Sequence, residues 1–216
     1  MSEIITTYEV RDPKIPIPMK RDEFYKEQTK THDRIGRTTK MVEIIGLLLF
    51  NTNGQIILQK RSPSKAHNPG LIDKSIGGHI KFDDSPFYTL MVETVQELRI
   101  PSIVLYTDED FRKTFQLLKS FLDHIAIVKL LGQGDYVLNR KIRGKNYKMH
   151  HRVHLFIGVY NGATKPVDQE ASGTLYYDLS GLKQEIKKRP ENFTDDLIMY
   201  LKKYETEMKE FLKHLK

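Results

Sequence analysis

Two apolar runs joined by an Asn-Gly turn constrain the fold of this chain more than any other feature. Residues 42–50 and residues 56–58 are rich in Ile, Leu and Val, and the segment between them reads Asn51-Thr52-Asn53-Gly54. Two β-prone runs around such a turn predict a hairpin. The chain therefore contains a β-sheet, and any helices must pack against it.

A helix with clear end signals follows this hairpin. Ser85 is a suitable N-cap, and Pro86 stands at the first helical position, where its missing N–H costs nothing. The helix is expected to end at Leu98, ahead of Pro101. Apolar residues at helical spacing predict its core face: Phe87, Leu90, Met91, Val95 and Leu98. Glu93 and Glu97 lie one turn apart on another face.

The remaining segments complete an α+β pattern. We expect strands at residues 8–10, at 71–80 across Gly77-Gly78, three within 125–160, and one at 173–178. We expect helices at residues 21–30, 107–122 and 179–188, and a final helix capped by Thr194.

These 216 residues are enough for one sizeable core, so we predict a single domain over residues 1–216. Residues 1–38 would form an N-terminal arm and helix, residues 39–190 the core, and residues 191–216 a C-terminal helix. Apolar residues in that last helix alternate spacings of four and three, as in a coiled-coil seam: Leu197, Leu201, Tyr204, Met208, Phe211 and Leu215. The seam either packs on its own domain or forms the contact of a homodimer.

Composition limits the classes of function. No apolar run approaches the roughly 18 residues that span a bilayer, and the N-terminus lacks the order of a secretory signal, so we expect a cytoplasmic protein without a membrane partner. The absence of cysteine excludes disulfides, thiolate zinc sites and a cysteine nucleophile. The net charge of +7 favours an anionic partner, either nucleic acid, a membrane surface or a phosphorylated small molecule, although solvated lysine-rich ends also account for it.

Glu93 and Glu97 are candidate ligands for a divalent cation. Two carboxylates at i and i+4 on a helix entered from a Gly-Gly strand end can bind Mg²⁺ (or Mn²⁺) together, while water and substrate phosphates complete the octahedron. The same spacing is frequent on solvated helices. His150, His151 and His154 do not form a second metal site, because a strand would place His151 on the face opposite the other two.

The residues from Gly78 onward resemble the signature of the Nudix superfamily, G-x5-E-x7-R-E-U-x-E-E-x-G-U, in which U is aliphatic. The matching positions are Gly78, Asp84, Val92, Glu93, Gln96, Glu97, Arg99 and Ile100. The resemblance implies an α/β/α sandwich with a mixed β-sheet between helices. It also implies that Glu93 and Glu97 are metal ligands and that Gln96 stands at a third ligand position, where a neutral amide contributes no charge. Val92 replaces the arginine that orients these ligands in the family.

A longer pattern upstream resembles the branch of the superfamily that contains isopentenyl-diphosphate isomerase. It comprises residues 59–65, Pro69-Gly70, Asp73, Ser75 and Gly78-His79. The resemblance implies that Arg61 and Lys65 hold the substrate diphosphate, and that Gly78 and His79 line the substrate site, with His79 at the isomerase's histidine ligand position. Isomerase chemistry itself is disfavoured, because Gly77 stands at the catalytic cysteine position and residues 150–152 offer no carboxylate.

Hydrolysis is the simpler chemistry and needs a base to activate water. Residues 166–177 resemble the loop that carries a glutamate base in many Nudix enzymes, so Glu170 and Glu93 are the candidate catalytic residues. The sequence thus predicts a metal-dependent hydrolase acting on a small-molecule diphosphate. Two alternatives stay open: a Nudix-fold protein that binds a phosphorylated metabolite or nucleotide without turnover, and a nucleic-acid-binding protein.

Overall fold

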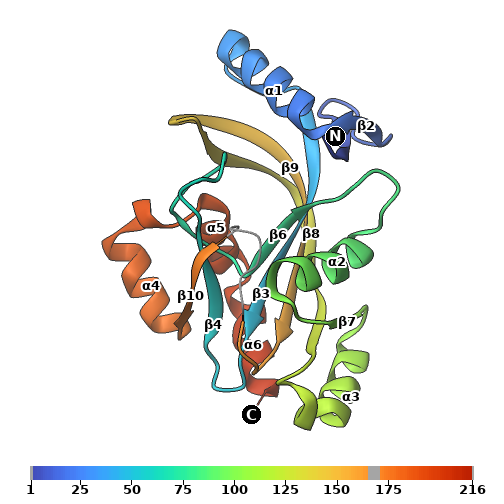
Figure 1. Cartoon of the computed structure of the whole chain (residues 1–216), viewed down its shortest axis with the longest axis vertical. Helices are drawn as coiled ribbons and strands as arrows, with labels where there is room; N and C mark the ends of the chain where they lie inside the picture. Colours follow the sequence, from blue (N-terminus) through green and yellow to red (C-terminus); the bar gives the residue numbers. More distant parts are fainter. Residues whose placement is uncertain (1, 165–170, 216) are drawn as a thin grey trace.

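The computed structural model describes residues 2–164 and 171–215. Its strands join into one mixed sheet with the main order β10-β4-β3-β9-β8-β7 (Figure 1). The β3/β9 and β7/β8 pairs are parallel and the other pairs are antiparallel. The strands of the described residues are β1 Ile4–Glu9, β2 Ile17–Lys20, β3 Lys40–Phe50, β4 Ile56–Arg61, β5 Ile72–Asp73, β6 Ile76–His79, β7 Ser102–Leu105, β8 Ala126–Ile142, β9 Lys145–Val159 and β10 Ala171–Tyr177.

Strand β3 lies inside the sheet, between β4 and β9, and both of its faces are covered. Ile44 and Leu48 join one hydrophobic cluster, whereas Ile45 and Leu47 join another on the opposite face. A strand that is buried on both faces has to be apolar almost throughout, which explains the apolar run at residues 42–50. The predicted hairpin to β4 is confirmed, with Gly54 at φ 80° in its turn.

Helices pack on both faces of this sheet (Figure 1). Leu90 and Leu98 of α2 belong to the cluster on one face, and Leu197 of α5 and Phe211 of α6 to the cluster on the other. The fold is therefore the predicted α+β sandwich of helices around a mixed sheet. The α-helices of the described residues are α1 Arg21–Ile35, α2 Pro86–Leu98, α3 Asp108–Leu118, α4 Leu179–Lys188, α5 Asp195–Lys203 and α6 Glu205–His214, and none is long and apolar enough to cross a membrane.

The N-terminal segment is more regular than expected. Strand β1 starts at Ile4 and pairs with both β2 and β3, and β2 occupies part of the stretch expected to be an extended connection. Helix α1 continues beyond residue 30 to Ile35 and ends at Gly36, whose φ of 74° is the left-handed conformation of a helix C-cap. The N-terminal arm is therefore joined to the sheet through the pairing of β1 with β3.

Two predictions about strands were wrong. The single strand expected at residues 71–80 is divided into β5, which pairs with β4, and β6, which pairs with β3. The three strands expected within residues 125–160 are two long strands, β8 and β9, joined at Arg143-Gly144. Gly132 lies at a shift of register between the two strands rather than in a turn, and Gly134 lies inside β8.

The C-terminal helix was also predicted wrongly, since it is broken into α5 and α6 at Tyr204. Thr194 stands at the N-cap of α5, but its hydroxyl donates to Asp73 Oδ1 at 2.8 Å instead of capping the helix. All six seam residues are buried within this chain. The seam therefore packs on its own domain and is not available to a second copy.

Helix α2 begins as predicted, with the Ser85 hydroxyl accepting from the N–H of Tyr88, but its core face is rotated from the predicted one. Met91 and Val95 are each 45% exposed, while Thr94 and Glu97 are buried. The Thr94 hydroxyl lies 2.9 Å from that of Ser102 on β7, so polar contacts hold this face inward. Glu97 consequently points into the protein.

Arg99 occupies the C-cap of α2 with φ 59°, the position where the Nudix signature has glycine. In the left-handed conformation a residue with a Cβ destabilises the folded state by roughly 1–2 kcal/mol, a cost that glycine avoids. Glycine has an opposing cost of about 0.5–1 kcal/mol, because it loses more backbone entropy on folding. We expect Arg99→Gly to raise the free energy of unfolding by about 0.5–1 kcal/mol in urea denaturation. Arg99→Ala, which keeps the Cβ, should give no such gain, and equal stability of the two variants would contradict this account.

Candidate active site

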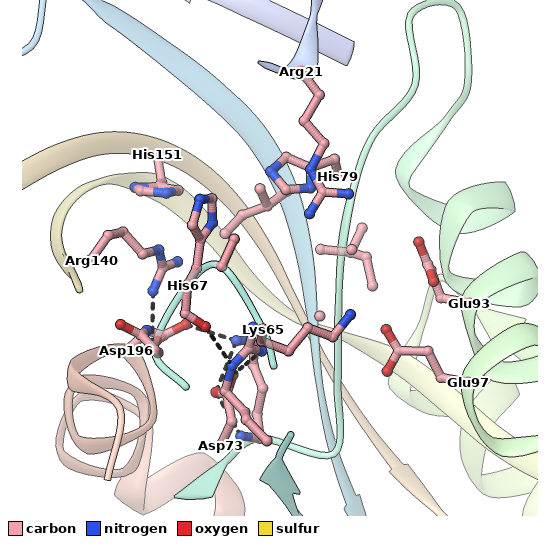
Figure 2. A pocket seen from close by; sticks show the side chains of 18 of the residues that line it. Arg21, Lys65, His67, Asp73, His79, Glu93, Glu97, Arg140, His151 and Asp196 are labelled. Atoms are coloured by element: carbon pink, nitrogen blue, oxygen red, sulfur yellow. Dashed lines mark hydrogen bonds and ion pairs between the residues drawn. The ribbon is translucent and has the colours of Figure 1, made fainter. Parts of the chain in front are cut away.

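A pocket of about 410 Å³ opens between α2, strand β6 and the loop after β4. Figure 2 shows Glu93 and Glu97 extending into it from α2, with Lys65 reaching toward them from the opposite side. Eight site residues are predicted from the sequence, and seven of them lie in the described part of the chain. All seven line this pocket: Arg61, Lys65, Gly78, His79, Glu93, Gln96 and Glu97. Glu170 lies outside the described residues.

The two carboxylates on α2 are held in an environment that disfavours their charge. Burial, followed by repulsion from Glu3, raises the pKa of Glu93 to about 7. Burial, followed by repulsion from Glu93, raises the pKa of Glu97 to about 8. Neither carboxylate forms an ion pair at salt-bridge distance within residues 2–164 and 171–215. Nearby cations favour the charged forms, Lys81 and Arg21 for Glu93 and Arg61 and Lys65 for Glu97, but burial outweighs them.

The double glycine of β6, Gly77-Gly78, makes room for the side chains of Glu93 and Lys74 beside the strand. A Cβ on Gly78 would lie 2.4 Å from Oε1 of Glu93, and a Cβ on Gly77 would lie 2.8 Å from Cε of Lys74. Both distances are below any ordinary carbon contact. Gly77 and Gly78 therefore clear space for two charged side chains on either side of the strand.

The wall opposite α2 is basic. Arg61 donates through Nε to the carbonyl of His67 and through NH1 to Asp73 Oδ2, both at 3.1 Å, which leaves its other terminal nitrogen for a ligand. Burial, followed by Arg61, lowers the pKa of Lys65, whereas Glu97 and Glu93 act in the opposite sense. Arg21, at the start of α1, adds a further cation above the pocket (Figure 2).

A buried ionic network beneath the pocket was not predicted from the sequence. Asp196 of α5 lies 2.7 Å from Lys74 Nζ and 3.1 Å from Arg140, and Asp73 lies 3.1 Å from both Lys74 and Arg61. Burial opposes the charge on Lys74, but Asp196 and Asp73 outweigh it and raise its pKa. Three cations facing two carboxylates leave one positive charge, which favours an anion above them.

Three histidines that line the pocket are neutral near pH 7. Burial and then Arg21 lower the pKa of His79 well below its usual value, and its Nε2 lies 2.7 Å from the hydroxyl of Tyr25. Burial also lowers the pKa of His67 to about 3 and that of His151 further below its ordinary range. A neutral imidazole can accept a hydrogen bond or bind a cation.

His150 and His154 are held elsewhere, as expected for a strand. His150 Nδ1 lies 2.7 Å from the hydroxyl of Thr38, and His154 Nε2 lies 2.7 Å from Glu43 Oε1. His151 alone of the three lines the pocket.

Glu97 provides a direct test of whether the site suits a divalent cation. It is 8% exposed, and its buried Oε2 receives no hydrogen bond from the described residues. No cluster of three or more histidine, aspartate or glutamate side chains at metal-binding distance occurs in residues 2–164 and 171–215. The donors are thus two carboxylates and the exposed amide of Gln96, which fits Mg²⁺, a cation that retains several waters and shares substrate phosphates.

Comparisons with known proteins agree with this architecture. No family model matches the chain. An isopentenyl-diphosphate Delta-isomerase from Serratia proteamaculans (strain 568) is 23% identical over 167 residues, 77% of each chain. The structure of DR0079 from Deinococcus radiodurans has a TM-score of 0.61 at 15% identity over 94% of this chain and 99% of that one. A MutT protein from Methanosarcina mazei Go1 has a TM-score of 0.53 at 15% identity over 77% and 94%.

The chain therefore has the Nudix fold. Within that class its sequence is similar to an isopentenyl-diphosphate isomerase, in agreement with the resemblance seen around Arg61 and Lys65. Both resemblances stated from the sequence are confirmed.

The raised pKa values predict a specific pH dependence of stability. The folded state binds more protons at Glu93 and Glu97 than the unfolded state between about pH 4.5 and 8, so these groups lower stability as pH rises through that window. In EDTA, the stability of Glu97→Gln relative to the wild type should therefore increase as the pH is raised from 5 to 9. The free energy of unfolding is measured by urea denaturation at each pH. Glu210→Gln on the exposed face of α6 is the control. A difference between Glu97→Gln and wild type that stays constant with pH would contradict the raised pKa of Glu97.

Proposed function

We propose that this protein is a divalent-cation-dependent hydrolase of the Nudix type, which cleaves a diphosphate linkage in a nucleoside diphosphate derivative or a related X-diphosphate. One observation carries the proposal. Two carboxylates of α2 and the basic residues Arg61 and Lys65 line opposite sides of one pocket. A cation bound to diphosphate needs both kinds of group within the same cavity.

Glu93 and Glu97 would hold Mg²⁺ or Mn²⁺, and Gln96 would offer a neutral oxygen. When bound, the cation would neutralise charge that develops on the bridging and non-bridging phosphate oxygens. The remaining nitrogen of Arg61 would donate to one phosphate, and Lys65 would act on the diphosphate as a point charge. Gly78 and His79 would form the adjoining wall, where Gly78 keeps the backbone close to the ligand.

Water attack on phosphorus requires a base, and Glu93 is the candidate within the described residues. Its pKa of about 7 is near the pH at which a general base is most effective. A cation bound to the same carboxylate would lower this pKa, so Glu93 would be ionised at neutral pH. Glu170, the other candidate, directly precedes β10 in the sequence and lies outside the described residues.

The similarity to an isopentenyl-diphosphate isomerase supports a substrate that carries a diphosphate. It does not support isomerisation here, because this chain has no cysteine and has Gly77 at that catalytic position. His151, which falls in the region of the expected acids, is neutral and donates its Nδ1 proton to the carbonyl of Met149. Hydrolysis needs none of these missing groups.

A binding role without turnover is the second candidate function. Val92 cannot donate the hydrogen bonds of the family's arginine, and Gln96 removes one negative charge from the ligand set. Both changes weaken cation binding more than they weaken the basic wall of the pocket. The protein would then sense a phosphorylated metabolite or nucleotide.

Hydrolysis assays separate the two candidates. The purified protein is incubated with a panel of nucleoside diphosphate derivatives in Mg²⁺ or Mn²⁺, and release of phosphate or monophosphate is measured. We expect cation-dependent release from at least one compound. Saturable binding without any release would instead identify the binding protein.

Glu97→Gln tests the role of the buried carboxylate. We expect it to lower kcat/KM by about 100-fold or more, since loss of even an outer-shell partner commonly costs 10–100-fold. Glu210→Gln is the matched control and should retain wild-type activity. Undiminished cation-dependent activity in Glu97→Gln would exclude Glu97 as a ligand.

A further inference from the structure

A second and larger cavity adjoins the candidate active-site pocket. This groove, of about 1120 Å³, lies between α1 and the tip of the β8–β9 hairpin. Arg21, Tyr25, Ala66 and His67 line both cavities, so the two are adjacent. Figure 1 shows the hairpin arching beneath α1 at the N-terminal end of the molecule.

The groove is formed by fixed contacts between the helix and the hairpin. The ring of His32 on α1 lies 5.3 Å from that of Tyr147 on β9, and its Nε2 accepts from the N–H of Lys148 at 3.3 Å. Asp33 and Lys145 form an ion pair across the same interface. The groove is therefore a preformed feature of the fold.

Apolar and aromatic side chains line the interior of this groove, and cations stand around them. Ile142 and Tyr147 come from the hairpin and Tyr25 from α1, while Lys26, Lys30 and Arg143 supply positive charge. Lys26 and Lys30 are one helical turn apart, where like charges repel. Within the described residues, these three cations have no carboxylate at salt-bridge distance.

The acidic residues of the groove do not offset this charge. Glu23 is paired with Lys20 at 3.1 Å, and Lys145 is already paired with Asp33. Only Asp22 remains against Lys26, Lys30 and Arg143. An anion bound among those three would relieve their mutual repulsion.

Arg143 lies in the turn of the hairpin that borders the groove. It has φ 49° and precedes Gly144 at φ 81°, a turn that asparagine followed by glycine adopts with less strain. This turn places Arg143 at the edge of the groove, which it lines. Its guanidinium is also the side chain best suited to phosphate.

We propose that this groove, which we call the distal groove, binds the non-hydrolysed half of the substrate, and that this half carries a phosphate group of its own. The proposal rests on the proposed function for the position of the diphosphate. The organic part of the ligand contacts Tyr25, Ile142 and Tyr147. Its phosphate is bound by Lys26, Lys30 and Arg143.

Two pairs of diphosphate compounds test the distal groove: NADP⁺ with NAD⁺, and coenzyme A with 3′-dephospho-coenzyme A. The members of each pair differ by one phosphate remote from the diphosphate. Affinities for the full chain are measured by calorimetry with Ca²⁺, and hydrolysis of the same compounds is measured with Mg²⁺. In at least one pair, we expect the phosphorylated member to bind about tenfold more tightly, as one charge-assisted phosphate contact predicts.

The double variant Lys26→Gln/Arg143→Asn should reduce this ratio to within about twofold. Asparagine tolerates the left-handed turn, so the hairpin is retained, and thermal unfolding checks this. Lys188→Gln, an exposed lysine of α4 away from the groove, is the matched control and should keep the wild-type ratio.

The outcomes separate this proposal from the proposed function. Equal affinities within both pairs, no binding of any of the four compounds, or a ratio that the double variant leaves unchanged would overturn the distal groove. Hydrolysis of any nucleoside diphosphate derivative would still support the enzyme in those cases. A tenfold preference that the double variant abolishes, without release of any product, would support the groove and contradict the hydrolase.

Discussion

The site depends on one constraint, which is that burial outweighs the nearby cations and raises the pKa of both Glu93 and Glu97 on α2. Glu97 is buried, and the charge of Glu93 raises its pKa further, while Glu93 itself lies against Gly78. A fold that depended only on stability would place apolar side chains there. In the proposed function a divalent cation would offset this energetic cost, and the same cation would attract phosphate to the basic wall formed by Arg61 and Lys65.

The buried network gives that basic wall its rigidity. Asp73 links Arg61 to Lys74, and Lys74 links Asp73 to Asp196 at the start of α5. Helix α5 therefore contributes to the pocket through Asp196. This network also explains why Thr194 does not cap α5, because its hydroxyl is needed by Asp73. A side chain fixed in this way loses little conformational entropy when it binds substrate.

The sequence predicted what local chemistry determines and missed what long-range contacts determine. The Asn-Gly hairpin and the start of α2 at Ser85 follow from turn and cap preferences, and the two family resemblances together named seven candidate residues that lie in one pocket. The core face of α2 could not be predicted from apolar spacing, because a polar pocket turned Glu97 inward and left Met91 outside. The pairing of Lys74 with Asp196 joins residues 122 positions apart, and no local pattern indicates it.

A crystal structure of the protein soaked in Mn²⁺ tests the central claim most directly. Anomalous scattering should give a peak within about 2.0–2.3 Å of carboxylate oxygens of both Glu93 and Glu97, on the side that faces Lys65. Occupancy should fall at pH 6, where protons compete for these groups. A peak bound only elsewhere, or no peak at pH 8 with both carboxylates turned toward bulk solvent, would contradict the account.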